Sequence, residues 1–78
     1  MRIFVQDMKG NSHPIEISQN DNILMLRNKL EKIIGIMQNN SRFVFNGEIL
    51  QNNDTISSYD IQVDNVITYV GEFLAGIL

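Results

Sequence analysis

Few residues in this chain have side chains that could perform catalysis. The chain has no cysteine and a single histidine, His13, which excludes disulfides, thiolate nucleophiles and cysteine-based zinc sites. His13 lies in an alternating stretch, where a lone histidine is more typical of packing than of a ligand or a general base. No recognisable motif places it with a hydroxyl and a carboxylate as a nucleophilic triad, and no glycine-rich phosphate loop is present. Asp54, Asp60 and Asp64 fall in polar loops and indicate solvated surface. The sequence therefore predicts a protein that is not an enzyme and that holds no metal and no cofactor.

The C-terminal run GEFLAGIL offers a different kind of chemistry. Its glycines, Gly71 and Gly76, space an apolar stretch that carries one charge, Glu72. Glycine has no Cβ, so an extended backbone that contains it fits a narrow channel and lets another backbone approach closely. We expect residues 1–70 to form the folded domain and residues 71–78 to form a flexible tail.

Composition and charge narrow the range of partners. A chain of 78 residues makes one domain, and its net charge is −3 with no cluster of basic residues. This argues against a nucleic-acid partner, because neutralising phosphates requires grouped lysines and arginines. No apolar run approaches the ~20 residues that span a bilayer, and the first residues do not resemble a signal peptide. We expect a monomer in the cytoplasm, the nucleus or both, with no membrane partner.

The first half of the chain predicts a hairpin followed by a helix. Residues 1–7 and 12–18 alternate with the period of half-buried strands, and Gly10 between them suits a bulged turn. Pro14 cannot donate to a ladder, so the second strand is expected at a sheet edge. The period then becomes helical, from an N-cap at Asn22 to a terminating glycine at Gly35.

The second half predicts three more strands. Asn46-Gly47 between residues 42–45 and 48–50 is a strong signal for a type I′ hairpin. In the polar connection that follows, Thr55 could cap one short helical turn, and residues 66–70 form the last strand. A single amphipathic helix is naturally buried against one face of a mixed sheet, which indicates an α+β fold. The predicted core is Met1, Ile3, Val5, Ile15, Ile17, Ile23, Leu26, Leu30, Phe43, Leu50, Ile56, Ile61, Ile67 and Tyr69.

Several segments resemble the ubiquitin family in order and spacing, namely MRIFVQDMKG, DNI, RFVFNGEIL, DTISSYDIQ and VITYV. The resemblance covers residues 1–70 without a gap and reaches Gly76 more loosely. It implies the β-grasp fold, a mixed sheet packed on one helix, with a short 3-10 turn before the last strand. It also implies that the strand containing Pro14 lies at the sheet edge.

The resemblance implies a protein-binding patch on the sheet face turned away from the helix. Carried over by position, this patch comprises Met8, Val44, Thr68 and Val70, and alternation alone also sends Val44 and Val70 outward. Arg42 and Gly47 stand at its border. Thr68 departs from the histidine usual in the family, so an imidazole contact is lost there. The implied partners carry ubiquitin-binding modules, and the alternative is that these are scattered surface residues of the ordinary kind.

The tail departs from the family pattern. In the family, a C-terminal Gly-Gly carboxylate is adenylated, passed to a thiol and joined to a lysine amine. Here Ala75-Gly76 takes that place, so a protease or an autoprocessing neighbour must first remove Ile77-Leu78. Glu72 also reverses a charge that the activating enzyme recognises. Two hypotheses stay open: a divergent modifier matured at Gly76 that meets activating and conjugating enzymes, and a non-covalent interaction domain, alone or cut from a larger chain.

A second surface is predicted outside the patch. A secondary surface is expected at Phe4, Ile36 and Phe73, and a third hypothesis has Phe73 and Leu74 fold back over Ile36 and Met8.

Lysines stand only at positions 9, 29 and 32. Lys29 coincides with a chain-linkage lysine of the family, although an ordinary solvated helix residue is the favoured interpretation. The helix also has more apolar residues than one core-facing stripe requires. A wider core contact under the 36–41 loop is favoured over an extra interface for these residues, which are Leu24, Met25 and some of Ile33, Ile34 and Met37.

Overall fold

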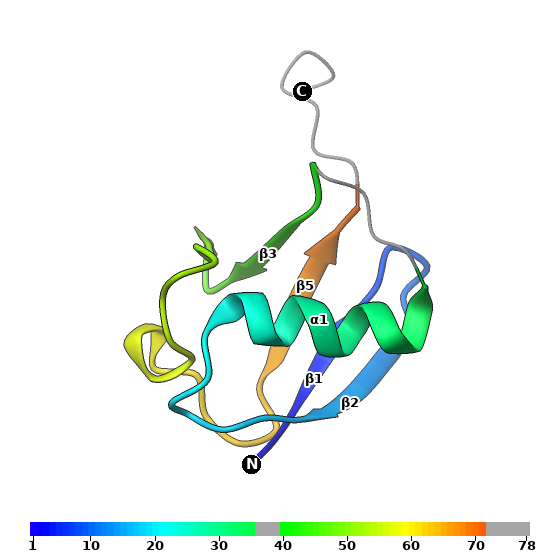
Figure 1. Cartoon of the computed structure of the whole chain (residues 1–78). Coiled ribbons are helices and arrows are strands. Elements are labelled where there is room, and N and C mark those ends of the chain that lie inside the picture. Colours follow the sequence, from blue (N-terminus) through cyan, green and yellow to red (C-terminus); the bar gives the residue numbers. More distant parts are fainter. Residues whose placement is uncertain (36–39, 72–78) are drawn as a thin grey trace.

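The computed structural model describes residues 1–35 and 40–71. Within these ranges the chain forms a five-stranded mixed sheet, and one α-helix crosses one face of it (Figure 1). The spatial order of the strands is β2-β1-β5-β3-β4, in which β1 and β5 run parallel and the other neighbours run antiparallel. This arrangement confirms the predicted α+β, β-grasp architecture. The elements are β1 (Arg2–Gln6), β2 (Ser12–Glu16), α1 (Ile23–Ile34), β3 (Arg42–Phe45), β4 (Glu48–Ile49), η1 (Ser57–Tyr59) and β5 (Val66–Val70).

Strand β2 lies at the sheet edge, as Pro14 predicts. Met1 and Ile17 exchange two backbone hydrogen bonds of 2.8 and 2.9 Å, so they form a hydrogen-bonded pair. Such pairs alternate with non-hydrogen-bonded pairs along an antiparallel ladder. Pro14, which stands opposite Phe4, therefore occupies a position where no donor is required.

Helix α1 begins and ends where its capping residues predict. The side chain of Asn22 accepts a hydrogen bond of 2.9 Å from the backbone N–H of Met25, which satisfies one of the orphan donors of the first turn. Gly35 adopts a φ of 95°, a conformation that glycine reaches without strain, and its N–H bonds to the carbonyl of Glu31.

The Asn46-Gly47 hairpin is also confirmed. Both residues have positive φ, 54° and 80°, as a two-residue type I′ turn requires. The short helical turn lies at η1, where the hydroxyl of Thr55 accepts from the N–H of Ser58 at 3.2 Å. The hydroxyl of Tyr59 then ties this turn to the preceding connection, because it donates to Asp54 at 2.6 Å.

The core lies between the sheet and the helix, and its composition follows the prediction with one exception. Met1 is half-buried and packs against the core rather than within it. The buried apolar residues are Ile3, Val5, Ile15, Ile17, Ile23, Leu26, Leu30, Phe43, Leu50, Ile56, Ile61, Ile67 and Tyr69. No helix in the described ranges is long and apolar enough to cross a membrane.

The wider core contact expected of the additional helix residues was wrong for those that the structure describes. The core stripe of α1 is formed by Ile23, Leu26 and Leu30. Leu24 and Met25 point away from this stripe at the helical period, whereas Ile33 and Ile34 follow Leu30 by three and four residues and continue the stripe at the end of the helix, where they are still exposed. The exposed residues are Leu24, Met25, Ile33 and Ile34, while Met37 lies outside the described residues.

Candidate functional site

The face of the sheet turned away from α1 carries the predicted patch on two neighbouring strands. In β5, Ile67 and Tyr69 are buried, so alternation turns Thr68 and Val70 outward. The antiparallel register sets Val44 opposite Thr68 and Arg42 opposite Val70. Residues directly opposite each other on one face lie within side-chain contact range. The fold therefore brings these four predicted residues together.

Ile49 belongs to the same surface, although sequence reasoning missed it. It stands opposite Val44 in the hairpin and is 40% exposed. The flanking contact, Leu50 N–H to the carbonyl of Phe43 at 2.8 Å, shows that the pair of Val44 with Ile49 is of the non-hydrogen-bonded kind, in which side chains approach most closely. Gly47 lies at the exposed tip of this hairpin. Alternation could have found Ile49, because Leu50 beside it is buried.

Met8 reaches this surface from the turn between β1 and β2. Its side chain is 65% exposed, and its Sδ accepts a hydrogen bond from the backbone N–H of Gly71 at 2.9 Å. Gly71 itself is buried. A Cβ at position 71 would lie 2.5 Å from this sulfur, so the contact requires glycine. Met8 thus connects the patch to the residue at which the predicted tail begins.

The turn that carries Met8 is held from beneath by Asp7. Its Oδ1 accepts the backbone N–H groups of Lys9 and Asn11, both at 2.9 Å, and its Oδ2 shares a 2.7 Å hydrogen bond with Nε2 of His13. The bond to His13 is the main cause that lowers the pKa of Asp7 below its usual value, and the two backbone donors act in the same direction. His13 is therefore half-buried and polar-paired rather than a simple packing residue. Its pairing with Asp7 was not predicted from the sequence.

Charged groups border the patch near β3. Arg42 donates from Nη1 to the carbonyl of Ser41 at 2.9 Å and is half-buried. Beneath the sheet, Arg27 donates to the Oγ and to the carbonyl of the same serine, at 2.5 and 3.1 Å, while its guanidinium lies 5.1 Å from the ring centroid of Phe43. Arg27 therefore anchors the start of β3, and Arg42 remains at the border of the outer face.

The predicted secondary surface is only partly within the described residues. Phe4 stands beside Val66 in the parallel pair of β1 and β5, on the same outer face as the patch. Arg2 covers its ring at 5.1 Å and pairs with Asp64 at 2.9 Å. Val66 is 47% exposed. The fold-back hypothesis and the processing site lie outside the described residues, because Ile36 and residues 72–78, which include Phe73, Leu74, Ala75 and Gly76, are not among them.

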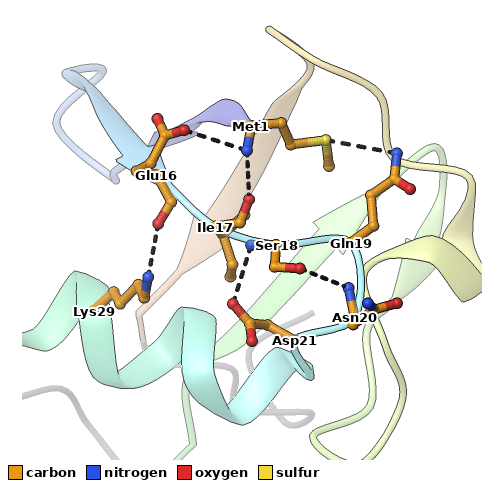
Figure 2. A pocket seen from close by; sticks show the side chains of 8 residues that line it. All are labelled: Met1, Glu16, Ile17, Ser18, Gln19, Asn20, Asp21 and Lys29. Carbon is orange, nitrogen blue, oxygen red and sulfur yellow. Dashed lines mark hydrogen bonds and ion pairs between the residues drawn. The ribbon is translucent and has the colours of Figure 1, made fainter.

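The other notable surface is a pocket beside the N-terminus, which Figure 2 shows. The amine of Met1 donates to the carbonyl of Ile17 at 2.8 Å and lies 3.2 Å from Oε1 of Glu16. Lys29 crosses from α1 and donates to the carbonyl of Glu16 at 2.8 Å. The Met1 amine pairs with Glu16, Lys29 is satisfied by a backbone carbonyl, and Asp21 accepts the backbone N–H of Ser18 at 3.0 Å. Within residues 1–35 and 40–71, no group of three histidine or carboxylate side chains could hold a metal ion.

One comparison with known proteins bears on this arrangement. The sequence model of the family described as "Ubiquitin family" matches residues 3–74 of the chain. The match covers the helix and all five strands except Arg2, the first residue of β1, and it includes every residue of the patch.

Proposed function

Because the chain belongs to the ubiquitin family, we propose that it is a ubiquitin-like protein modifier, recognised through the outer sheet face and attached through Gly76 to amines of other proteins. Members of this family typically act as modifiers or binding domains rather than as enzymes. The observation that supports the recognition part of the proposal is the convergence of Met8, Val44, Ile49 and Val70 on one face of the sheet.

The patch suits a weak and reversible contact. Burial of ~300 Å² of apolar surface at ~25 cal/mol/Å² supplies about 7 kcal/mol. The loss of translational and rotational freedom on association costs about 4–15 kcal/mol, which offsets most of this gain. We expect dissociation constants of roughly micromolar to millimolar. A covalent bond to the target, or several copies together, would raise the effective concentration enough for such a contact to act.

Attachment requires a free carboxylate at Gly76. The bond between Gly76 and Ile77 must therefore be hydrolysed first, by a protease or an autoprocessing element. The carboxylate then attacks the α-phosphate of ATP and releases pyrophosphate, an enzyme thiol takes the acyl group with loss of AMP, and an amine of the target displaces that thiol to form the amide. Glu72 and Ala75 indicate that the activating enzyme differs in its tail specificity from one that selects arginine and Gly-Gly. We place these events in the cytoplasm, the nucleus or both.

The second candidate function is a non-covalent ubiquitin-like interaction domain. Glu72 and Ala75 favour it, because both depart from the conjugation tail of the family. Intact-mass spectrometry of the protein from its native cells separates the two functions. Loss of Ile77 and Leu78 together with isopeptide adducts through Gly76 would establish the modifier. A population found only unprocessed and unconjugated would refute it in favour of the interaction domain.

The patch is tested by a pair of matched valine substitutions. Val44→Ala shortens a side chain at the centre of the patch, whereas Val63→Ala shortens an exposed valine in the connection before β5. We titrate each ¹⁵N-labelled variant with an isolated helical ubiquitin-binding module and follow the amide shifts. Val44→Ala is expected to weaken binding severalfold while Val63→Ala leaves it unchanged. Equal affinities for the two variants, or shifts centred away from β3 and β5, would contradict the assignment.

A further inference from the structure

Met8 is the member of the patch that a mild oxidant can change. Peroxides convert a thioether into a sulfoxide, which makes a flexible apolar side chain polar, and methionine sulfoxide reductases reverse the change. The neighbouring Val44, Thr68 and Val70 have no group that reacts in this way. The chain has four methionines, and the surroundings of each one decide what its oxidation does.

Met8 is more accessible to a dissolved peroxide than the other methionines that the structure describes. It is 65% exposed, whereas Met25 is 41% exposed and Met1 is half-buried against the core. One lone pair of the Met8 sulfur accepts the N–H of Gly71 at 2.9 Å. A thioether sulfur has a second lone pair, so this hydrogen bond leaves the sulfur able to attack an oxidant.

Gly71 lies close enough to the sulfur to respond to its oxidation. A Cβ at this position would lie 2.5 Å from Sδ, so the sulfur is packed against the glycine backbone. In a sulfoxide the sulfur carries a partial positive charge, and the oxygen becomes the acceptor. The N–H of the buried Gly71 then loses its partner or bonds to the oxygen, which pushes the sulfur back by the length of an S–O bond. A buried N–H without a partner is unfavourable, so either outcome changes how Met8 and Gly71 meet.

The backbone of the turn does not depend on this sulfur. Asp7 holds it through the N–H groups of Lys9 and Asn11 and through its bond to His13. The side chain of Met8 has three rotatable bonds and can move while the turn stays in place. Oxidation is therefore expected to act on the patch and on the end of β5, and to leave the sheet folded.

Oxidation also changes what the patch can bind. The sulfoxide oxygen is a hydrogen-bond acceptor that holds water, and an apolar partner surface that covers it must remove this water. Burial of a polar group without a compensating hydrogen bond is unfavourable. The reduced patch is expected to bind in the range of roughly micromolar to millimolar. A severalfold loss of affinity from such a starting point would leave little complex.

We propose that Met8 is an oxidation site, at which hydrogen peroxide reversibly weakens the patch and breaks the contact between its sulfur and Gly71. This inference rests on the recognition part of the proposed function. The sulfur lone pair attacks one peroxide oxygen, the S–O bond forms and the O–O bond breaks. Sulfur is oxidised by two electrons, and the other oxygen leaves as water after it takes the proton of the transferred oxygen. Reduction by two thiols returns the thioether and gives a disulfide and water.

The first experiment tests the site without any partner. The full chain is treated with dilute hydrogen peroxide, peptide mass spectrometry quantifies the sulfoxide at each methionine, and ¹H-¹⁵N spectra follow the amide of Gly71. Met8 is expected to oxidise several times faster than Met1, and the Gly71 resonance should shift in proportion to the conversion of Met8. Oxidation of Met1 ahead of Met8 would overturn the proposal, as would an unmoved Gly71 resonance when Met8 is fully converted.

The second experiment measures binding to the isolated helical ubiquitin-binding module before and after peroxide. Each protein is compared with itself, so differences in starting affinity between variants do not matter. The double variant Met25→Leu, Met37→Leu retains Met8 and should lose affinity severalfold, as the unsubstituted chain does. Met8→Leu keeps an apolar side chain without sulfur and should show no change with peroxide. Treatment with both classes of methionine sulfoxide reductase should restore the original affinity.

The outcomes separate the oxidation site from the proposed function. A loss of affinity that persists in Met8→Leu, that is absent from the double variant or that the reductases do not reverse would refute the oxidation site alone. A reduced chain that does not bind the module at all would refute the recognition part of the proposed function, and with it the role of Met8.

Discussion

Replacement of Gly71 by alanine tests the contact that joins the patch to the tail. The new Cβ would lie 2.5 Å from Sδ of Met8, but 3.6 Å from Cε2 and 3.7 Å from the hydroxyl oxygen of Tyr69, which are ordinary contacts. Favourable separations are roughly 3.5–4.0 Å, so the sulfur must retreat by about 1 Å or more while the tyrosine stays in place. The methionine has three rotatable bonds and can make this movement. The Gly71→Ala variant is therefore expected to fold and to expel Met8 from its position.

The stability change follows from two opposing contributions. Loss of the hydrogen bond from Gly71 to Met8 costs about 0.5–1.5 kcal/mol, and the weak acceptor strength of sulfur places it at the low end. Alanine also restricts the unfolded chain, which stabilises by about 0.4–1 kcal/mol at a position without positive φ, and Gly71 is such a position. Gly71→Ala should thus change the free energy of unfolding by less than about 1 kcal/mol. In a Met8→Ala background the clash is absent, so the same substitution should stabilise.

Urea unfolding of the four proteins in this double-mutant cycle measures the coupling free energy, and ¹H-¹³C spectra report the methyl group of Met8. We expect a coupling of about 0.5–1.5 kcal/mol and a clear shift of the Met8 methyl resonance in Gly71→Ala. Affinity for the helical ubiquitin-binding module should fall, because the displaced methionine no longer completes the patch. An additive cycle with an unmoved methyl resonance would refute the reasoning. A decrease of more than about 2 kcal/mol in the free energy of unfolding of Gly71→Ala alone would also refute it.

Three further predictions concern the supports of the sheet and helix. Arg27→Lys should lower the free energy of unfolding by about 1–3 kcal/mol in urea titrations. Lysine cannot donate to both oxygens of Ser41 and at the same time lie over the ring of Phe43 as the guanidinium does. An unchanged urea midpoint would contradict this. The folded-state pKa of Asp7 lies below its ordinary 3.8, so the stability it contributes is present above that pH and is lost as pH falls through the folded value. Thermal melts between neutral and strongly acidic pH should show this loss as a falling melting temperature. In Asp7→Asn the melting temperature should fall less steeply at acidic pH. An unchanged slope would show that the bond to His13 is unimportant. Asn22→Ala should lower the free energy of unfolding by about 1 kcal/mol, because it removes the helix cap. The control is Asn28→Ala, at an exposed position within the helix. Equal losses in the two variants would show that capping is not the cause.

The candidate site was predictable in part, because alternation and helical period depend only on neighbouring residues. Burial of Phe43 and Tyr69 sets Val44 and Val70 outward, whatever lies across the sheet. The same rule applies to Ile49, which was missed because its hairpin strand is short. The exposed state of Ile33 on the helix was not predictable, since a residue at the margin of an apolar stripe is buried only if the fold supplies a neighbour there.

By itself, the sequence determined the order of the elements, the two ends of the helix and the position of the hairpin turn, while three strands are shorter than predicted, at 2–6, 12–16 and 48–49. Asn22, Gly35 and Asn46-Gly47 act within a few residues of their own positions, so their effects are independent of the rest of the chain. Only the tertiary structure decided which distant groups meet. Met8 contacts Gly71 across 63 positions of sequence. That contact exists because the parallel pairing of β1 with β5 brings the end of the last strand beside the first turn, and no local pattern records a pairing register between segments so far apart.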